Sequence, residues 1–260
     1  MEQATPITLR GPDHCPARRG LSLILALAGG AITWGVVEGI HPVFSVPKEY
    51  EAPDIGMPPE VYRKNRWARE RMERHHAMLY VGTLGAALAA GLALASRAKG
   101  RSFYGGAAAA IALATAGGVA GGHVASRVHE YIYEHYGQPA LQHTVIEQMV
   151  LLLPLGLAVG LGWGLARLRI RQAIAGALAG LLAGLAAALA YPVAVSLLLP
   201  GASTDMLLPM ERPSRALWFF LVSGTLGLVV PLAQPNRAHP DTLPSAPASA
   251  GDPAESSQNP

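Results

Sequence analysis

Histidine and carboxylate side chains in this sequence concentrate beside the ends of its apolar segments. Glu38 and His41 close the first apolar segment, and His143 and Glu147 precede the fourth. Because each pair is three or four residues apart, its members would share one helix face. Imidazole nitrogens and carboxylate oxygens are ligands for zinc and other divalent first-row metals. Together with His123, these residues are the predicted metal ligands.

The same concentration of residues supports two other interpretations. Imidazole titrates near pH 6.5, so a histidine cluster facing outward would sense external acidification. Tyrosine, tryptophan and long charged side chains also gather at membrane interfaces for structural reasons. Tyr131, Tyr133 and Tyr136 stand in the same stretch as several of the histidines, as an aromatic belt would. The sequence leaves metal binding, proton sensing and interfacial structure open.

The elements that must position these residues are transmembrane helices. Hydrophobic residues make up 51% of the chain and charged residues only 14%, with a mean hydropathy of +0.28, which is too apolar for an ordinary soluble domain. A helix needs about 20 mostly apolar residues to cross the hydrocarbon core. Six segments qualify: residues 20–37, 77–95, 102–122, 148–166, 172–199 and 216–233. The predicted fold is an all-α integral membrane bundle of about six transmembrane helices.

The bundle at 20–233 is flanked by two tails. Residues 1–19 form a predicted N-terminal tail, and residues 234–260 are rich in Pro, Ser and Ala and are predicted to be disordered. The long connection at 42–76 begins with a Pro-rich loop, and Pro59 suits a first helical position. The helix that follows carries charges of both signs. It would either lie in the membrane interface or lead directly into the second span.

Basic residues in the short connections predict the orientation. The turns at 96–101 and 167–171 each carry three Lys or Arg residues and no acid, which places them and both termini in the cytoplasm. The 42–76 connection would then lie outside, although it is also rich in Arg. The predicted location is a cell membrane, inner or plasma, and the Glu and His residues would lie at its outer face.

Small residues four positions apart recur in the fourth and fifth segments. Gly156, Gly160 and Gly164 lie in one, and Gly176, Gly180 and Gly184 lie in the other. Such spacing lets helix backbones approach closely in lipid. Because a very short turn joins the two segments, they are predicted to form an antiparallel hairpin.

No enzyme motif is present, and the protein is not predicted to be an enzyme. The sequence contains no phosphate-binding Lys loop, no G-x-S-x-G and no H-E-x-x-H, so no catalytic residue is assigned. Cys15 is the single cysteine, which excludes an intramolecular disulfide. The cofactor is left unassigned: the residues suggest either no cofactor or a divalent metal such as zinc.

Two functional hypotheses follow. The first is a structural or accessory membrane subunit, whose partners are the bilayer, other membrane helices or a second copy of the chain. The alternative is a small ion or metal transport protein, in which Glu38, His41, His123 and Glu147 converge at an outer entry site. Nucleic acid is not an expected partner, because the basic residues flank the apolar segments, where membrane orientation explains them.

Overall fold

The computed structural model describes residues 15–42, 44–45, 58–96, 101–136, 140–166, 170–202, 207–209 and 211–233. Of residues 15–19 and 101–103 it describes the backbone only. Within these residues the chain is helical and contains no strand. The helices are α1 (Cys15–Ile40), α2 (Pro59–Ala95), α3 (Arg101–Tyr136), α4 (Leu141–Leu165), α5 (Ile170–Leu198), α6 (Arg212–Val229) and the short 3₁₀ helix η2 (Val230–Ala233). All six α-helices contain a segment long and apolar enough to cross a membrane. The predicted fold class is confirmed.

Helix α2 is longer than a membrane is thick. Its 37 residues span about 55 Å at about 1.5 Å per residue, whereas the hydrocarbon core is about 30 Å thick. The helix is continuous, so the charged stretch at 60–76 leads directly into the second apolar segment. Helix α3 has 36 residues and likewise runs past its predicted apolar segment, ending at Tyr136. The charged N-terminal part of α2 and the charged C-terminal part of α3 therefore extend beyond the apolar part of the bundle.

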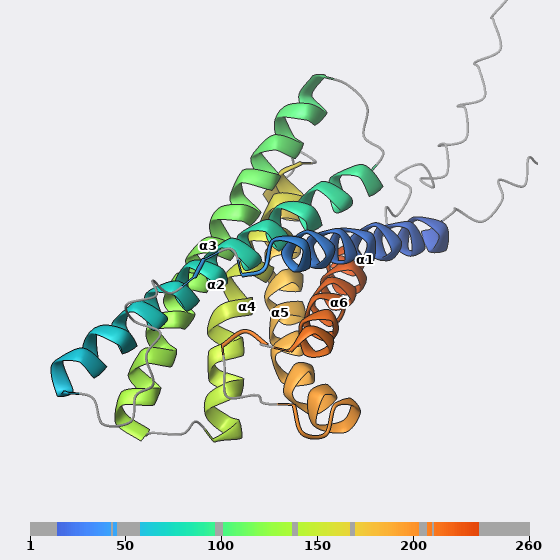
Figure 1. Ribbon diagram of the computed structural model, residues 1–260. Coiled ribbons are helices and arrows are strands. Elements are labelled where there is room, and N and C mark those ends of the chain that lie inside the picture. The colour runs from blue at the N-terminus through green and yellow to red at the C-terminus, as the bar shows by residue number, and fades with distance from the viewer. Residues whose placement is uncertain are drawn as a thin grey trace, which may run out of the picture.

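Each α-helix packs against the next one in sequence, and α1 packs against α6, so the six α-helices form a closed ring; Figure 1 labels these helices. Helix α6 closes the ring by packing against α1. The two run antiparallel, because Glu38 meets Arg215 at one end and Gly227 lies against Leu23 near the other. One end of the bundle therefore gathers the C-terminal ends of α1, α3 and α5 with the N-terminal ends of α2, α4 and α6. We call it the polar end.

Glycines bring α4 and α5 into backbone contact. Gly156 lies against Gly180, and Gly160 lies against Gly176, so that a Cβ atom on any of them would overlap a backbone carbonyl of the facing helix. Close approach of this kind lets dispersion contacts hold helices together where lipid removes the hydrophobic driving force. The two helices form the antiparallel hairpin that their glycine spacing predicted.

Helix α5 buries its small residues and exposes its large ones. Gly180, Ala183 and Ala187 are buried, whereas Leu178 and Leu182 are more than half exposed. In water this distribution would leave apolar surface unprotected, but acyl chains solvate aliphatic side chains well. The outward Leu side chains therefore belong against lipid, and the inward Gly and Ala residues permit tight packing.

Candidate functional site

The polar end holds most of the buried polar side chains of the described residues. Among them are His76, His129, Glu147, Gln148 and Arg215. Burying polar groups costs free energy unless they are hydrogen-bonded, and an ionisable group at membrane depth is a candidate functional residue. These side chains and their neighbours therefore make up the candidate functional site.

An ion pair joins α1 to α6 beside this site. The Arg215 guanidinium donates through Nε to Glu38 Oε1 at 2.7 Å, and Arg212 approaches the other carboxylate oxygen at 3.5 Å. The side chains of Glu38 and Arg215 are 13% and 7% exposed. Pro209 adds its carbonyl oxygen as a further acceptor for Arg215, at 3.4 Å. The charge of Arg215 is thereby balanced within the protein.

Three aromatic side chains lie next to this ion pair. His41 Nδ1 and the Tyr80 hydroxyl are 2.7 Å apart, and the ring of His76 stacks on Tyr80 with 5.4 Å between centroids. The Phe44 amide donates to His76 Nε2 at 3.0 Å, so a neutral His76 carries its proton on Nδ1. Burial lowers the pKa of His41, and the nearby positive charge of Arg215 lowers this pKa further.

These residues border a pocket of about 230 Å³. Its lining consists of His41, Pro42, Met72, Glu73, His76, Tyr80, Leu207, Leu208, Pro209 and Arg215. The lining thus comes from α2, from the start of α6, from the residues after α1 and from the segment 207–209. Among the described residues, Glu73 has no hydrogen bond or ion pair. The Glu73 carboxylate, without a hydrogen bond or ion pair among the described residues, therefore lies among apolar and aromatic side chains.

Gln148 fixes one wall of the pocket. Its amide nitrogen donates to the Leu207 carbonyl at 2.9 Å, and its amide oxygen accepts from Trp218 Nε1 at 2.9 Å. Gln148 and Trp218 are each 1% exposed. Because buried donors and acceptors are costly to leave unpaired, this pairing holds the segment 207–209 against α4 and α6.

A second buried pair links α3 to α4. His129 Nδ1 lies 3.0 Å from Glu147 Oε1, and Glu147 is 1% exposed. Its other oxygen, Oε2, is buried without a hydrogen-bond partner among the described residues. A carboxylate so enclosed is stabilised mainly by the imidazole beside it.

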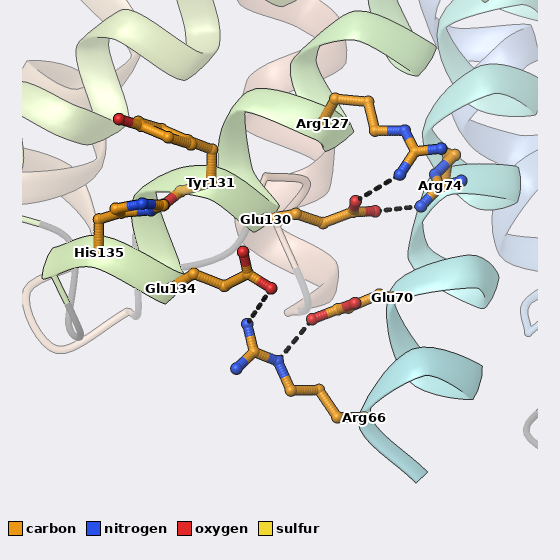
Figure 2. Close-up of polar contacts among 8 residues, drawn as sticks. All are labelled: Arg66, Glu70, Arg74, Arg127, Glu130, Tyr131, Glu134 and His135. Carbon is orange, nitrogen blue, oxygen red and sulfur yellow. Dashed lines mark hydrogen bonds and ion pairs between the residues drawn. The ribbon is translucent and has the colours of Figure 1, made fainter. Parts of the chain in front are cut away.

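Outside the bundle core, ion pairs fasten the extended parts of α2 and α3 together. Figure 2 shows eight polar side chains of this region: Arg66, Glu70, Arg74, Arg127, Glu130, Tyr131, Glu134 and His135. Glu130 forms ion pairs with Arg74 of α2 and with Arg127 of its own helix. Arg66 bonds Glu70 at 2.6 Å and approaches Glu134 at 3.7 Å. Arg74–Glu130 and Arg66–Glu134 join α2 to α3, whereas the other two pairs lie within one helix.

The predicted metal ligands occupy separate environments. Glu38 and His41 lie near each other and near Arg215, whereas Glu147 pairs with His129. His123 is exposed on α3. Across the part of the chain that the structure describes, no three His, Cys, Asp or Glu side chains are grouped so that they could hold a metal ion. The expected convergence of Glu38, His41, His123 and Glu147 is therefore not found among the described residues. Glu38 bonds to α6, His41 to α2 and Glu147 to α3, whereas His123 is exposed.

His143, the fifth predicted ligand, lies at the start of α4. Its ring packs against Tyr136 with 4.9 Å between centroids, and its Nδ1 accepts the Ala140 amide at 3.2 Å. It thus helps to cap the helix. The first free amides of a helix need such acceptors.

Several residues of the site escaped sequence reasoning. Tyr80, Gln148 and Arg215 sit at or inside the apolar segments, where a polar residue is unusual and was itself a usable signal. Glu73 stood among many charges and had nothing to distinguish it. Glu147 was among the predicted metal ligands, but the sequence did not indicate that His129 on α3 would be its partner.

Comparisons with known proteins gave no match. No protein family matches the chain, and neither a curated protein nor a solved structure resembles it significantly. The class of protein accordingly comes from the fold alone. Six apolar helices, each with a segment that can span a bilayer, make this an all-helical multi-pass membrane protein.

Proposed function

We propose that this protein binds a small organic solute in the pocket at its polar end, as the recognition step of transport across the membrane. The observation that carries the proposal is the pocket itself, in which an uncommitted carboxylate, two histidines and a tyrosine face apolar side chains. Binding sites for small molecules are mostly apolar concavities with a few convergent polar groups. Buried ionisable residues near membrane depth also favour a functional role over a structural one.

The pocket's construction further supports solute binding. Its lining comes from separate segments of the chain, so small shifts between helices would change its access. A transporter needs such an arrangement, because its site must open to each side in turn. In the proposed orientation the pocket opens first to the outside of the cell, as the basic short turns imply.

The first test is a ligand screen with a pocket-filling variant. A ligand that binds only the folded state raises the melting temperature in detergent, so purified protein would be heated with a library of amines, carboxylates and neutral solutes. Leu208→Trp would fill the pocket, and Leu189→Trp, on the lipid-facing side of α5 and 48% exposed, is the matched control. The proposal expects at least one ligand that stabilises the parent and the control but not Leu208→Trp. Solute binding in the pocket is refuted if every ligand that stabilises the parent also stabilises Leu208→Trp, or if no ligand stabilises the parent.

Orientation is tested separately by cysteine labelling. With Cys15 changed to Ser, a single Leu208→Cys substitution places a thiol in the pocket wall. A membrane-impermeant maleimide added to intact cells should label this thiol. If labelling occurs only after the membrane is opened, the pocket faces the cytoplasm and the proposed orientation is reversed.

A role as an accessory subunit is the second candidate, and one face of α1 favours it. Gly35 and Gly39 lie four residues apart, and nothing stands within 4 Å of a Cβ atom placed on either one. Ile32 and Val36 are exposed beside them. A second membrane helix fits a face of this kind. Cross-linking in membranes, compared between the parent and Gly35→Leu, would reveal a partner or a second copy at this face.

A further inference from the structure

The charges around the pocket indicate what kind of solute it accepts. Arg215 contributes a positive charge, but Glu38 balances it at 2.7 Å. Arg74, one residue beyond Glu73, is committed to Glu130 on α3. Glu73 is the remaining carboxylate of the lining, and it has no hydrogen bond or ion pair among the described residues. His129 and Arg69 lie near enough to interact electrostatically with Glu73, but neither bonds to it among the described residues. The pocket therefore offers one carboxylate whose oxygens have no bonded partner.

The aromatic side chains complement a positive charge. Tyr80 and His76 stack on each other, and both border the pocket with His41. The face of a tyrosine ring attracts a cation, more strongly where water is excluded. A ligand cation placed between the Glu73 carboxylate and these rings would meet both attractions.

The rest of the lining suits a hydrocarbon group. Met72, Leu207 and Leu208 supply aliphatic surface, and Pro42 and Pro209 add two further apolar rings. The volume of about 230 Å³ is slightly below the usual range of about 300–1,000 Å³ for drug-sized ligands. The occupant must therefore be small, with a compact apolar body.

We infer that the pocket binds a small organic cation, a primary ammonium group on a compact apolar body, with Glu73 as its counter-ion. This inference rests on the proposed function and specifies the solute class. The ammonium group lies at Glu73, on the side of the carboxylate that faces the His76 and Tyr80 rings, and the apolar body lies against Met72, Leu207 and Leu208. Arg215 stays paired with Glu38, so it does not repel the ligand at full strength.

Three probes of similar shape and different charge test this inference. They are phenethylammonium, the neutral 2-phenylethanol and the anionic 3-phenylpropionate, each titrated into purified protein in detergent and followed by calorimetry and by melting temperature. Phenethylammonium should bind at least about tenfold more tightly than either of the others, which corresponds to about 1.4 kcal/mol. Leu208→Trp should abolish its binding.

Charge variants assign the effect to Glu73. Glu73→Gln keeps the size of the side chain and removes its charge, so it should weaken phenethylammonium binding at least about tenfold and leave 2-phenylethanol binding unchanged. Glu73→Asp should restore part of the affinity. Glu60→Gln is the matched control, because Glu60 is exposed in the first turn of the same helix, and it should bind like the parent.

The possible outcomes separate this inference from the proposed function. The cation inference is overturned if 2-phenylethanol or 3-phenylpropionate binds as tightly as phenethylammonium, if no probe binds, or if a folded Glu73→Gln variant keeps full affinity. The proposed function still holds after any of these results if a ligand of another class binds the parent protein but not Leu208→Trp. If Glu73→Gln does not fold, the comparison of the three probes on the parent protein decides.

Discussion

Glu38 and Arg215 stand 177 positions apart in the sequence and 2.7 Å apart in the structure. The first residue lies near the end of α1 and the second near the start of α6, so their contact closes the ring of helices at the polar end. Both side chains are largely buried. The pair therefore joins the first and last membrane helices and also neutralises a charge in the pocket wall.

Removing Arg215 should destabilise the protein strongly. Arg215→Met leaves the Glu38 carboxylate buried without its main partner, and breaking a buried ion pair in this way costs about 3–5 kcal/mol. Thermal unfolding in detergent would measure the loss. Arg212→Met is the control: Arg212 lies 3.5 Å from Glu38, but its side chain is 71% exposed, so its removal should cost no more than about 1 kcal/mol.

A double variant checks that the loss reflects the orphaned charge. Glu38→Gln combined with Arg215→Met removes both charges and should recover part of the stability lost by Arg215→Met alone. If the single and double variants melt at the same temperature, the cost comes from lost packing and the ion pair contributes little.

Gln148 should be needed for the shape of the pocket as well as for stability. Gln148→Leu leaves the Leu207 carbonyl and the Trp218 indole N–H without their partner, at a cost of about 1–3 kcal/mol for each group. The segment 207–209 should then loosen. We expect a lower melting temperature together with weaker binding of any ligand of the pocket. Unchanged binding in a folded Gln148→Leu variant would contradict this role.

The glycines of α4 and α5 should not tolerate even one methyl group. A Cβ atom on Gly160 would overlap the Gly176 carbonyl, so Gly160→Ala forces the two helices apart, with a typical overpacking cost of about 1–3 kcal/mol. Gly35→Ala makes the same chemical change on the open face of α1. It should be neutral or stabilising by up to about 1 kcal/mol, because Ala favours helix over Gly. Melting temperatures that fall equally in the two variants would contradict the packing argument.

His41 should make stability depend on pH. Because burial lowers its pKa in the folded state, the folded state binds the proton less readily than the unfolded chain. The stability contributed by neutral His41 is present above the unfolded pKa of about 6.5 and is lost as the pH falls through that value toward the lower folded pKa.

The measurement compares the parent with His41→Gln. Charged and titratable groups near His41 are Glu38, Arg215, Tyr80 and His76, and they remain in both proteins. Melting temperatures recorded between about pH 8 and about pH 5 should fall more steeply for the parent. Parallel curves would show that His41 does not carry the dependence.

Apolar runs alone sufficed to predict the six spans, because a bilayer requires long uninterrupted apolar helices. The glycine spacing also predicted the α4–α5 hairpin, since close backbone approach in lipid needs small residues at that repeat. Both features depend on neighbours within one helix or across one short turn. The spacing of residues along one helix is enough to predict contacts of this local kind.

The site was harder to predict because its contacts cross helices that are distant in sequence. The spacing of Glu38 and His41 predicted a shared helix face; the two residues do interact, but His41 follows the end of α1. The spacing could not reveal that Arg215 contacts Glu38 and that Tyr80 contacts His41. His123 and Glu147 entered the predicted metal set through their residue types, whereas helix rotation sends their side chains to different surroundings. Rotation about a helix axis is set by packing against neighbours, and a single sequence does not report it.

The antiparallel packing of α6 on α1 has a consequence for how the chain could be rewired. Gly227 lies against Leu23 and Ala26, and η2, which follows α6 directly, also contacts α1. A short linker from Ala233 to Gly20 would therefore complete the ring covalently. New termini could then be opened in the connection between α2 and α3, giving a circular permutant in which Glu38 and Arg215 lie on consecutive helices joined by the linker.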